Sequence, residues 1–179
     1  MSPLPSAYGW LATLDPLPRM IKEALLLFGT VEAAANANSP TIISWADEVG
    51  GKVDHVYKAD SIPWCGLFMA VAAKRAGKQV PTDPLWALNW ARFGLPAGQP
   101  MLGDVLIFVR PGGGHVALYI GEDAAAYHVL GGNQCDQVCF TRIAKSRLHR
   151  VRRPAYNIVP STVRPYILKG AGQLSVNEA

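Results

Sequence analysis

The chain has 179 residues, of which 50% are hydrophobic and 17% are charged. This composition fits one globular domain with a core and excludes an intrinsically disordered chain. The net charge of +4 favours contact with anionic surfaces but is too small to identify one, and we expect no nucleic-acid partner. No run of about 18 apolar residues occurs, so the sequence predicts no membrane span.

The predicted elements change in type along the chain. Four prolines fall within residues 1–18, which we expect to form an extended arm. Glycine stops and a Ser-Pro helix start predict helices over 19–28, 40–49, 65–77 and 85–94. Runs rich in apolar and β-branched residues predict strands over 105–109, 115–120, 126–130, 137–142 and 150–153. Helices followed by antiparallel strands predict an α+β fold.

Cys65 is the first candidate for a catalytic residue. It follows Pro63-Trp64 and begins the apolar run over 65–77 that is predicted to be a helix. Unpaired N–H groups and the dipole at a helix N-terminus stabilise a thiolate, so we expect a lowered pKa for this thiol. The N–H of Cys65 is also placed to help bind an oxyanion. A lone cysteine is more often a buried structural residue, so the hypothesis needs a partner.

His115 is the histidine best placed to be that partner. It follows the turn Pro111-Gly112-Gly113-Gly114 and begins a predicted strand, which makes its imidazole accessible and oriented. A cysteine nucleophile needs such a base within hydrogen-bond reach. His55, His128 and His149 fit less well, because they lie in a polar stretch, inside a predicted strand and among arginines.

A third polar group would orient the imidazole. Asn133 is the candidate, although the sequence Gly-Gly-Asn is also typical of a turn. Asp104 is a rival, to which we assign a structural role in the turn before the strand at 105–109. Cys135 and Cys139 have no zinc-ligand spacing around them. A disulfide between these two cysteines remains an alternative, because both could lie on one strand and face the same way.

Several stretches, taken in order, resemble the NlpC and CHAP superfamily of bacterial and phage cell-wall hydrolases, and most closely a phage- and prophage-associated subfamily. They are Ile62-Pro63-Trp64-Cys65-Gly66-Leu67-Phe68, Gly103-Asp104-Val105-Leu106-Ile107-Phe108, Gly114-His115-Val116-Ala117-Leu118-Tyr119 and Leu130-Gly131-Gly132-Asn133-Gln134. Gly29-Thr30-Val31-Glu32, with Asn38 and Ile42, is similar to the opening helix and loop of that subfamily. The sequence departs from the subfamily pattern at Ala33-Ala34-Ala35-Asn36-Ala37 and in its two extra cysteines.

The resemblance implies a papain-like fold in which N-terminal helices pack on a central antiparallel β-sheet. It implies Cys65 as the nucleophile, His115 as the base and Asn133 as the orienting residue. The implied reaction cleaves an amide bond in a peptidoglycan stem peptide or cross-link, with no metal and no cofactor. The resemblance covers residues 19–154.

That range is the expected hydrolase domain, between a proline-rich arm at 1–18 and a tail at 155–179. The expected substrate contacts are Trp64, Trp86 and Gln134, and core packing is the default for the two tryptophans.

The expected partner is bacterial peptidoglycan, with phage-like tail or baseplate proteins as a further one. The chain would then occur in a virion or tail particle, or in the cytoplasm of the producing cell before release as an endolysin. One alternative is a structural or delivery component of a phage-like tail tip whose hydrolase activity is secondary or lost. Another is an acyltransferase or deamidase with a different substrate, because fold does not fix substrate.

Overall fold

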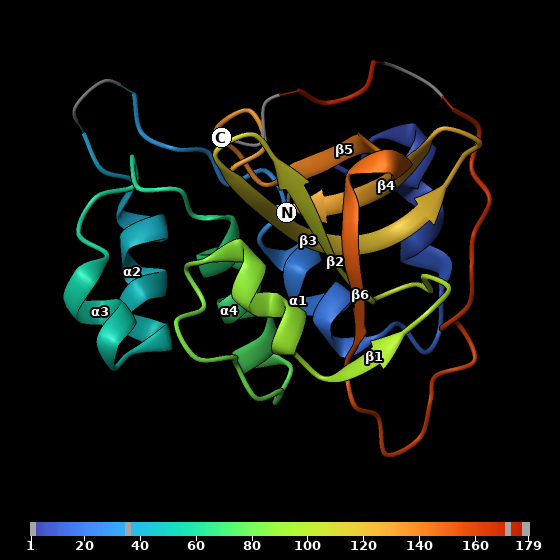
Figure 1. The fold of residues 1–179 in the computed structure, drawn as a ribbon, viewed down its shortest axis with the longest axis horizontal. Coiled ribbons are helices and arrows are strands. Elements are labelled where there is room, and N and C mark those ends of the chain that lie inside the picture. Colours follow the sequence, from blue (N-terminus) through green and yellow to red (C-terminus); the bar gives the residue numbers. More distant parts are fainter. Residues whose placement is uncertain (1–2, 35–36, 171–172, 177–179) are drawn as a thin grey trace.

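The computed structural model describes residues 3–34, 37–170 and 173–176. In this part of the chain an antiparallel six-stranded sheet lies beside a group of helices (Figure 1). The strand order is β1-β6-β2-β3-β4-β5. The fold is therefore α+β, as the order of the predicted elements indicates.

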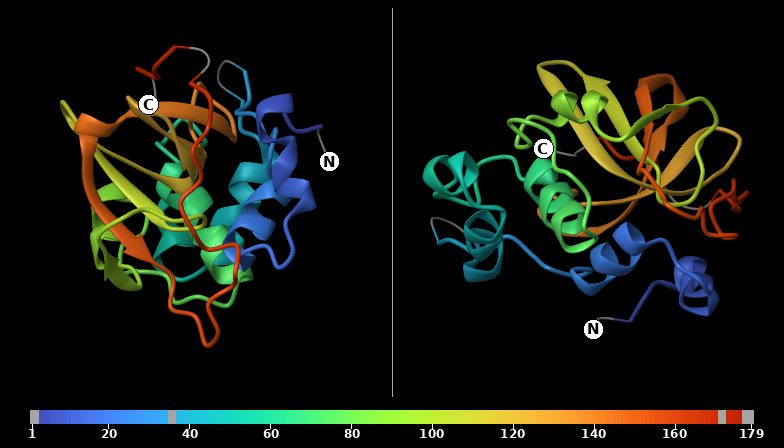
Figure 2. Two further views of the ribbon diagram at one scale, coloured as in Figure 1. Left: turned by 90° about the vertical axis from the view of Figure 1, so that its right-hand side faces the viewer. Right: turned by 90° about the horizontal axis from the view of Figure 1, so that it is seen from below.

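Apart from η3, which lies between β5 and β6, the helical segments precede the strands in the sequence and gather on one side of the sheet (Figure 2). The helices are η1 (Ser6–Thr13), α1 (Arg19–Leu26), α2 (Pro40–Val49), α3 (Lys52–Val56), α4 (Cys65–Arg75), η2 (Ala87–Arg92) and η3 (Lys145–Arg147), where η marks a 3-10 helix. The strands are β1 (Leu95–Ala97), β2 (Val105–Arg110), β3 (Gly113–Glu122), β4 (Ala126–Gly131), β5 (Cys139–Ala144) and β6 (Leu148–Arg153).

The helices predicted over 19–28, 40–49 and 65–77 are confirmed as α1, α2 and α4. Gly50 ends α2 with a φ of 74°, a left-handed value that glycine adopts without strain. The helix predicted over 85–94 is present as the shorter η2. Among the helices of the described residues, none combines the length and the apolar character needed to cross a membrane.

The predicted strands are confirmed as β2 to β6, with ends that differ by one to two residues. Strand β1 was not predicted. It is three residues long and contains Pro96, which has no N–H to donate, and it lies at the sheet edge where such a residue is tolerated.

Both faces of the central strands are buried. Alternate residues of β3, such as Val116 and Leu118, belong to the large core that includes the helices. Ala117 and Tyr119, which point to the opposite face, belong to a smaller core with Leu106 of β2. The helices therefore cover one face of the sheet, and α4 lies on that face.

The extended conformation expected for the N-terminal arm is wrong for the residues of η1. Tyr8 and Leu11 are buried. The Tyr8 ring stacks on Phe140 with ring centroids 4.1 Å apart, and its hydroxyl lies 2.8 Å from Nδ1 of His128. Burial of these apolar groups stabilises the arm against the sheet. The prolines alone do not predict this packing.

The segment after residue 154 also returns to the sheet. The N–H of Glu122 donates to the carbonyl oxygen of Tyr166, and the N–H of Leu168 donates to the carbonyl oxygen of Glu122, both at 2.8 Å. Tyr166 stacks on Trp10 of η1. The described part of the tail thus contacts both the end of β3 and the N-terminal arm.

Asp123 links His128, which contacts the hydroxyl of Tyr8, to Arg142 in β5. Its Oδ2 accepts hydrogen bonds from Nε2 of His128 at 2.8 Å and from Nη2 of Arg142 at 2.7 Å. Its Oδ1 accepts from the N–H groups of Ala125 and Ala126. Burial acts to raise the pKa of Asp123, but these donors outweigh it and hold the pKa well below its usual range.

This carboxylate predicts acid sensitivity. A carboxyl group whose pKa is lower in the folded chain stabilises the fold above its unfolded pKa of about 4, and that contribution is lost as the pH falls. Asp123→Asn should reduce the free energy of unfolding by about 2 kcal/mol at pH 7 and flatten its decline toward pH 3, measured by urea denaturation. Asp15→Asn, at an exposed position, is the control. An unchanged acid limb in Asp123→Asn would contradict the prediction.

Candidate functional site

Cys65 is the first residue of α4, at the helix N-terminus where the sequence places it. The backbone N–H groups of Val116 in β3 and of Gly66 lie near enough to its sulfur to favour the thiolate. Val116 directly follows His115 in the chain. The structure therefore brings the candidate nucleophile beside the strand that carries the candidate base.

Two glycines allow α4 to lie this close to its neighbours. A Cβ atom on Gly66 would lie 2.7 Å from the carbonyl oxygen of Leu85. A Cβ atom on Gly132 would lie 2.5 Å from Cβ of Phe68 and 2.8 Å from Cζ3 of Trp64. Real Cβ atoms do not approach other heavy atoms so closely, so any side chain at either position would push the first turn of α4 away.

His115 lies near the start of β3, opposite Phe108 of β2. Its side chain is fully buried. Its Nε2 lies 3.0 Å from Oε1 of Gln134, in the loop that follows β4. The imidazole is therefore held from the side of that loop.

The surroundings of Gln134 determine which way its amide faces. Its Nε2 donates to the carbonyl oxygens of Cys139 at 2.6 Å and Gly131 at 3.3 Å. Its Oε1 accepts from Oγ1 of Thr141 at 3.0 Å. With the NH2 group facing two carbonyls, Oε1 must face His115, so Nε2 of His115 carries the proton. The lone pair of a neutral imidazole is then on Nδ1.

The sequence analysis expected Asn133 in this role, whereas the contact at Nε2 of His115 comes from the next residue. Asn133 is buried, and its φ of 53° is left-handed. Asparagine tolerates this conformation better than most residues, which agrees with the alternative interpretation of Asn133 as a turn residue. Cys135 and Asp136 also have positive φ, so the chain direction changes rapidly here.

The opening motif of the family resemblance lies against this loop. Residues 29–32 pair with residues 136–138 through backbone hydrogen bonds of 2.8–3.0 Å. Glu32 accepts a hydrogen bond from Nε1 of Trp64 at 2.9 Å. Segments that are distant in sequence thus hold both the loop of Gln134 and the residue before Cys65.

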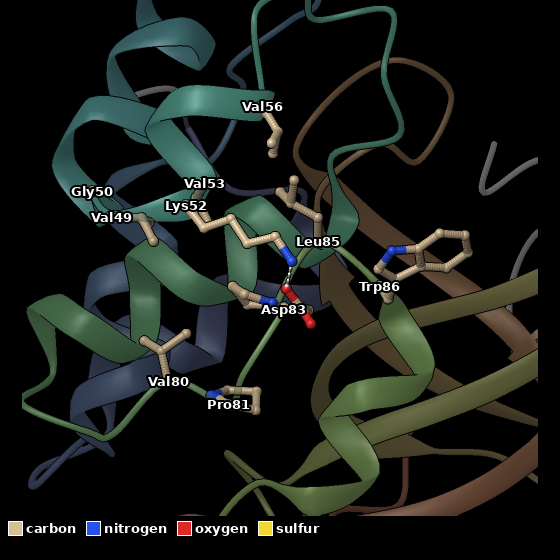
Figure 3. Close-up of a pocket in the computed structure, with 11 residues that line it drawn as sticks. Val49, Gly50, Lys52, Val53, Val56, Val80, Pro81, Asp83, Leu85 and Trp86 are labelled. Carbon is tan, nitrogen blue, oxygen red and sulfur yellow. Dashed lines mark hydrogen bonds and ion pairs between the residues drawn. The ribbon is translucent and has the colours of Figure 1, made fainter.

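The three expected substrate contacts lie in different environments. Trp64 and Gln134 are fully buried, so neither faces a groove in this structure. Trp86 is 73% exposed and lines a cavity of about 490 Å³. Lys52 reaches Asp83 at 2.7 Å beside this cavity, and the side chains of Val53, Val56 and Leu85 make its wall apolar (Figure 3).

A short segment, residues 84–88, packs against the residues that follow Cys65 and precede His115. The carbonyls of Pro84 and Leu85 lie against Gly66, next to Cys65. Leu88 lies against Gly114, next to His115, so closely that a Cβ atom there would be 2.6 Å from Cδ2 of the leucine. Cys65 itself is only 2% exposed.

Burial changes the acidity expected of the thiol. It raises the pKa of Cys65, while the N–H groups of Val116 and Gly66 and the charge of Arg110 act in the opposite direction. The helix start is present, but in this closed arrangement desolvation outweighs it. The lowered pKa expected from the sequence is therefore not found, and the resting thiol is protonated at neutral pH.

Asp104, the rival orienting residue, has a different set of partners. Its carboxylate forms two hydrogen bonds to Arg153, at 2.8 and 2.7 Å, and accepts from the N–H of Met101 at 2.9 Å. It precedes β2, whereas His115 pairs with Phe108 toward the far end of that strand. These contacts give Asp104 the structural role expected from its turn.

No group of three or more His, Cys, Asp and Glu side chains that could hold a metal ion occurs within residues 3–34, 37–170 and 173–176. No model of a known protein family matches the chain, and no curated protein matches it either.

The close packing around Gly132 gives a stability prediction. In Gly132→Ala the new methyl group meets Phe68 and Trp64, so we expect a loss of about 2 kcal/mol in the free energy of unfolding. Gly98→Ala is the matched control, since a Cβ atom there has nothing within 4 Å. Urea denaturation of both variants measures the difference, and equal stabilities would show that α4 does not depend on this contact.

Proposed function

We propose that this chain is a papain-like cysteine hydrolase of the NlpC and CHAP type that cleaves an amide bond in peptidoglycan. The observation that carries the proposal is the position of Cys65, at the start of α4 and beside the backbone N–H of the residue after His115. A nucleophile on a helix N-terminus and a base on an adjacent strand are what this chemistry requires.

The fold supports the proposal through the order of its parts. The helix with the candidate nucleophile comes first, and the antiparallel strand with the candidate base comes later and packs against it. The stretches that resemble the superfamily also meet in space, because residues 29–32, the start of α4, the start of β3 and the loop after β4 contact one another.

The proposed reaction is an acyl transfer. Nδ1 of His115 takes the proton of the Cys65 thiol, and the thiolate attacks the carbonyl carbon of the substrate amide. Backbone N–H groups at the start of α4, including that of Cys65, stabilise the developing oxyanion. The imidazolium then gives its proton to the leaving amine. Water, deprotonated by His115, attacks the thioester and releases the acyl product.

Gln134 is the positioning residue in this proposal, in place of Asn133. Its Oε1 accepts from Nε2 of His115, which keeps Nδ1 as the basic nitrogen and also stabilises the imidazolium. Its own NH2 group is fixed by the carbonyl oxygens of Cys139 and Gly131, so the amide cannot turn without losing those bonds.

Substrate access requires the site to open, because Cys65 and His115 are buried. Residues 84–88 are the segment that moves in this proposal, since they pack against Gly66 and Gly114 beside the pair. Trp86 lies within this segment, is exposed and borders the cavity of about 490 Å³. Its indole offers a flat surface for a sugar ring or an apolar group of the stem peptide. We infer that substrate bound against Trp86 favours the open position of the segment, with the bacterial cell wall as the place of action.

The first test is removal of the nucleophile. Cys65→Ala should abolish the loss of turbidity of purified peptidoglycan, because no other group in the proposal forms the acyl-enzyme. His115→Ala should lower the rate by about 10²- to 10⁴-fold. Cys135→Ser, at an exposed cysteine, is the control and should hydrolyse as the wild type does under reducing conditions. Undiminished lysis by Cys65→Ala would refute the proposal.

The second test concerns the positioning residue. Gln134→Ala should lower kcat/KM by about a hundredfold through misplacement of the base. It should also shift the tautomer of His115, read from the imidazole ¹⁵N resonances, in a way that a purely structural residue would not. Asn133→Gly preserves a left-handed backbone and should cost less. If Asn133→Gly proves more damaging and leaves Gln134→Ala active, the orienting role belongs to Asn133.

A further inference from the structure

Cys139 is in direct contact with the residue that positions His115. Its Sγ lies 3.3 Å from the carbonyl oxygen of Gln134 and 3.9 Å from the side-chain Nε2 of the same residue. The Nε2 of Gln134 also donates to the carbonyl oxygen of Cys139 at 2.6 Å. Any displacement of Cys139 relative to Gln134 therefore acts on the amide that faces the imidazole.

A second thiol lies at the next residue along the same loop. The Gln134 carbonyl belongs to the peptide that leads into Cys135, and a trans peptide sets that oxygen about 2.8 Å from the following Cα. Sγ of Cys139 is therefore within about 6 Å of the Cα of Cys135. Cys135 lies inside a tight turn, in which the N–H of Gln134 donates to the carbonyl oxygen of Gln137 at 3.1 Å, and Cys139 follows that turn by two residues.

The two thiols differ in exposure. Neither forms a disulfide in the structure, and Cys135 is exposed whereas Cys139 is partly buried. Burial raises the pKa of Cys139 to about 11, so this thiol is protonated at neutral pH and is a poor first nucleophile. Cys65 is only 2% exposed. A soluble oxidant therefore meets Cys135 first.

We propose that Cys135 and Cys139 are a redox pair whose oxidation to a disulfide withdraws Gln134 from His115 and lowers the activity of the site. Formation of the bond follows from the loop geometry alone, whereas the loss of hydrolysis rests on the function proposed above.

The oxidant is a low-molecular-weight disulfide such as oxidised glutathione. The Cys135 thiolate attacks one sulfur and releases one glutathione thiolate, which leaves a mixed disulfide. Cys139 then loses its proton, attacks the sulfur of Cys135 and releases the second glutathione. The two protein thiols lose two electrons and two protons, and one oxidised glutathione becomes two reduced molecules.

The link to His115 follows from where the sulfurs must go. A disulfide sulfur carries no hydrogen, so oxidation removes the hydrogen bond that Sγ of Cys139 donates to the Gln134 carbonyl and draws this sulfur to about 2.05 Å from that of Cys135. Residue 135 is joined to Gln134 by one peptide bond, so the turn moves with it. The hydrogen bonds between Gln134 and Cys139 then no longer have their present geometry, and the amide that faces His115 loses its support.

The experiment compares the wild type with Cys135→Ser and Cys139→Ala after equilibration with oxidised or reduced glutathione. Trypsin releases both cysteines in one peptide, residues 93–142, because Arg110 precedes a proline, whereas Cys65 lies in residues 59–74. We expect the wild-type peptide 93–142 to be lighter by two hydrogens and to resist iodoacetamide after oxidation. Dithiothreitol should reverse both changes.

The coupling has its own readouts. The ¹⁵N resonances of the His115 imidazole should shift on oxidation of the wild type but not of Cys135→Ser, and peptidoglycan hydrolysis should fall by about tenfold or more in the wild type alone. Cys135→Ser changes an exposed side chain, so it remains usable as the control variant even if Cys139→Ala does not fold.

A disulfide that leaves the His115 resonances unchanged overturns the proposal, as does oxidation that stops at a glutathione adduct on Cys135. If the reduced wild type does not hydrolyse peptidoglycan, the proposed function fails, and the resonances still decide whether the pair is coupled to His115.

Discussion

The first turn of α4 can reach the sheet only because glycine occupies its points of closest contact. Gly66 lies against the carbonyls of residues 84–85, and Gly132 lies against Phe68 and Trp64. This approach brings the sulfur of Cys65 to the N–H of Val116. Glycine at these two positions therefore lets the start of α4 pack against both the strand with His115 and the loop after β4. The chemistry of the site depends on that close approach.

Most of the regular structure could be predicted because local signals and tertiary packing agree. Glycine stops and the Ser39-Pro40 start bound the helices, and apolar β-rich runs mark the central strands, which are buried on both faces. Sequence signals do not predict the segments whose conformation depends on tertiary packing. Proline predicts an extended arm, yet burial of Tyr8 and Leu11 folds η1. Strand β1 forms because an edge strand tolerates the missing donor of Pro96.

The candidate site could be predicted as far as chain position determines it. A cysteine at a helix start and a histidine after a glycine turn are visible in the sequence, and both lie there in the structure. Burial is not visible, and so the rise in the pKa of the thiol was not foreseen. Side-chain direction in a loop of left-handed residues cannot be deduced either, and so the contact between Gln134 and His115 was not foreseen.

With residues 84–88 as the segment proposed to move, the alkylation rate of Cys65 measures how often its buried thiol becomes exposed. A small alkylating reagent can reach a thiol that is 2% exposed only during the fraction of time in which the segment is displaced. At low reagent concentration the labelling rate is then the rate of the exposed thiol multiplied by that fraction, just as amide hydrogen exchange reports local opening. Ligands that hold the segment open would accelerate labelling, so soluble fragments of a substrate can be ranked without any bond being cleaved.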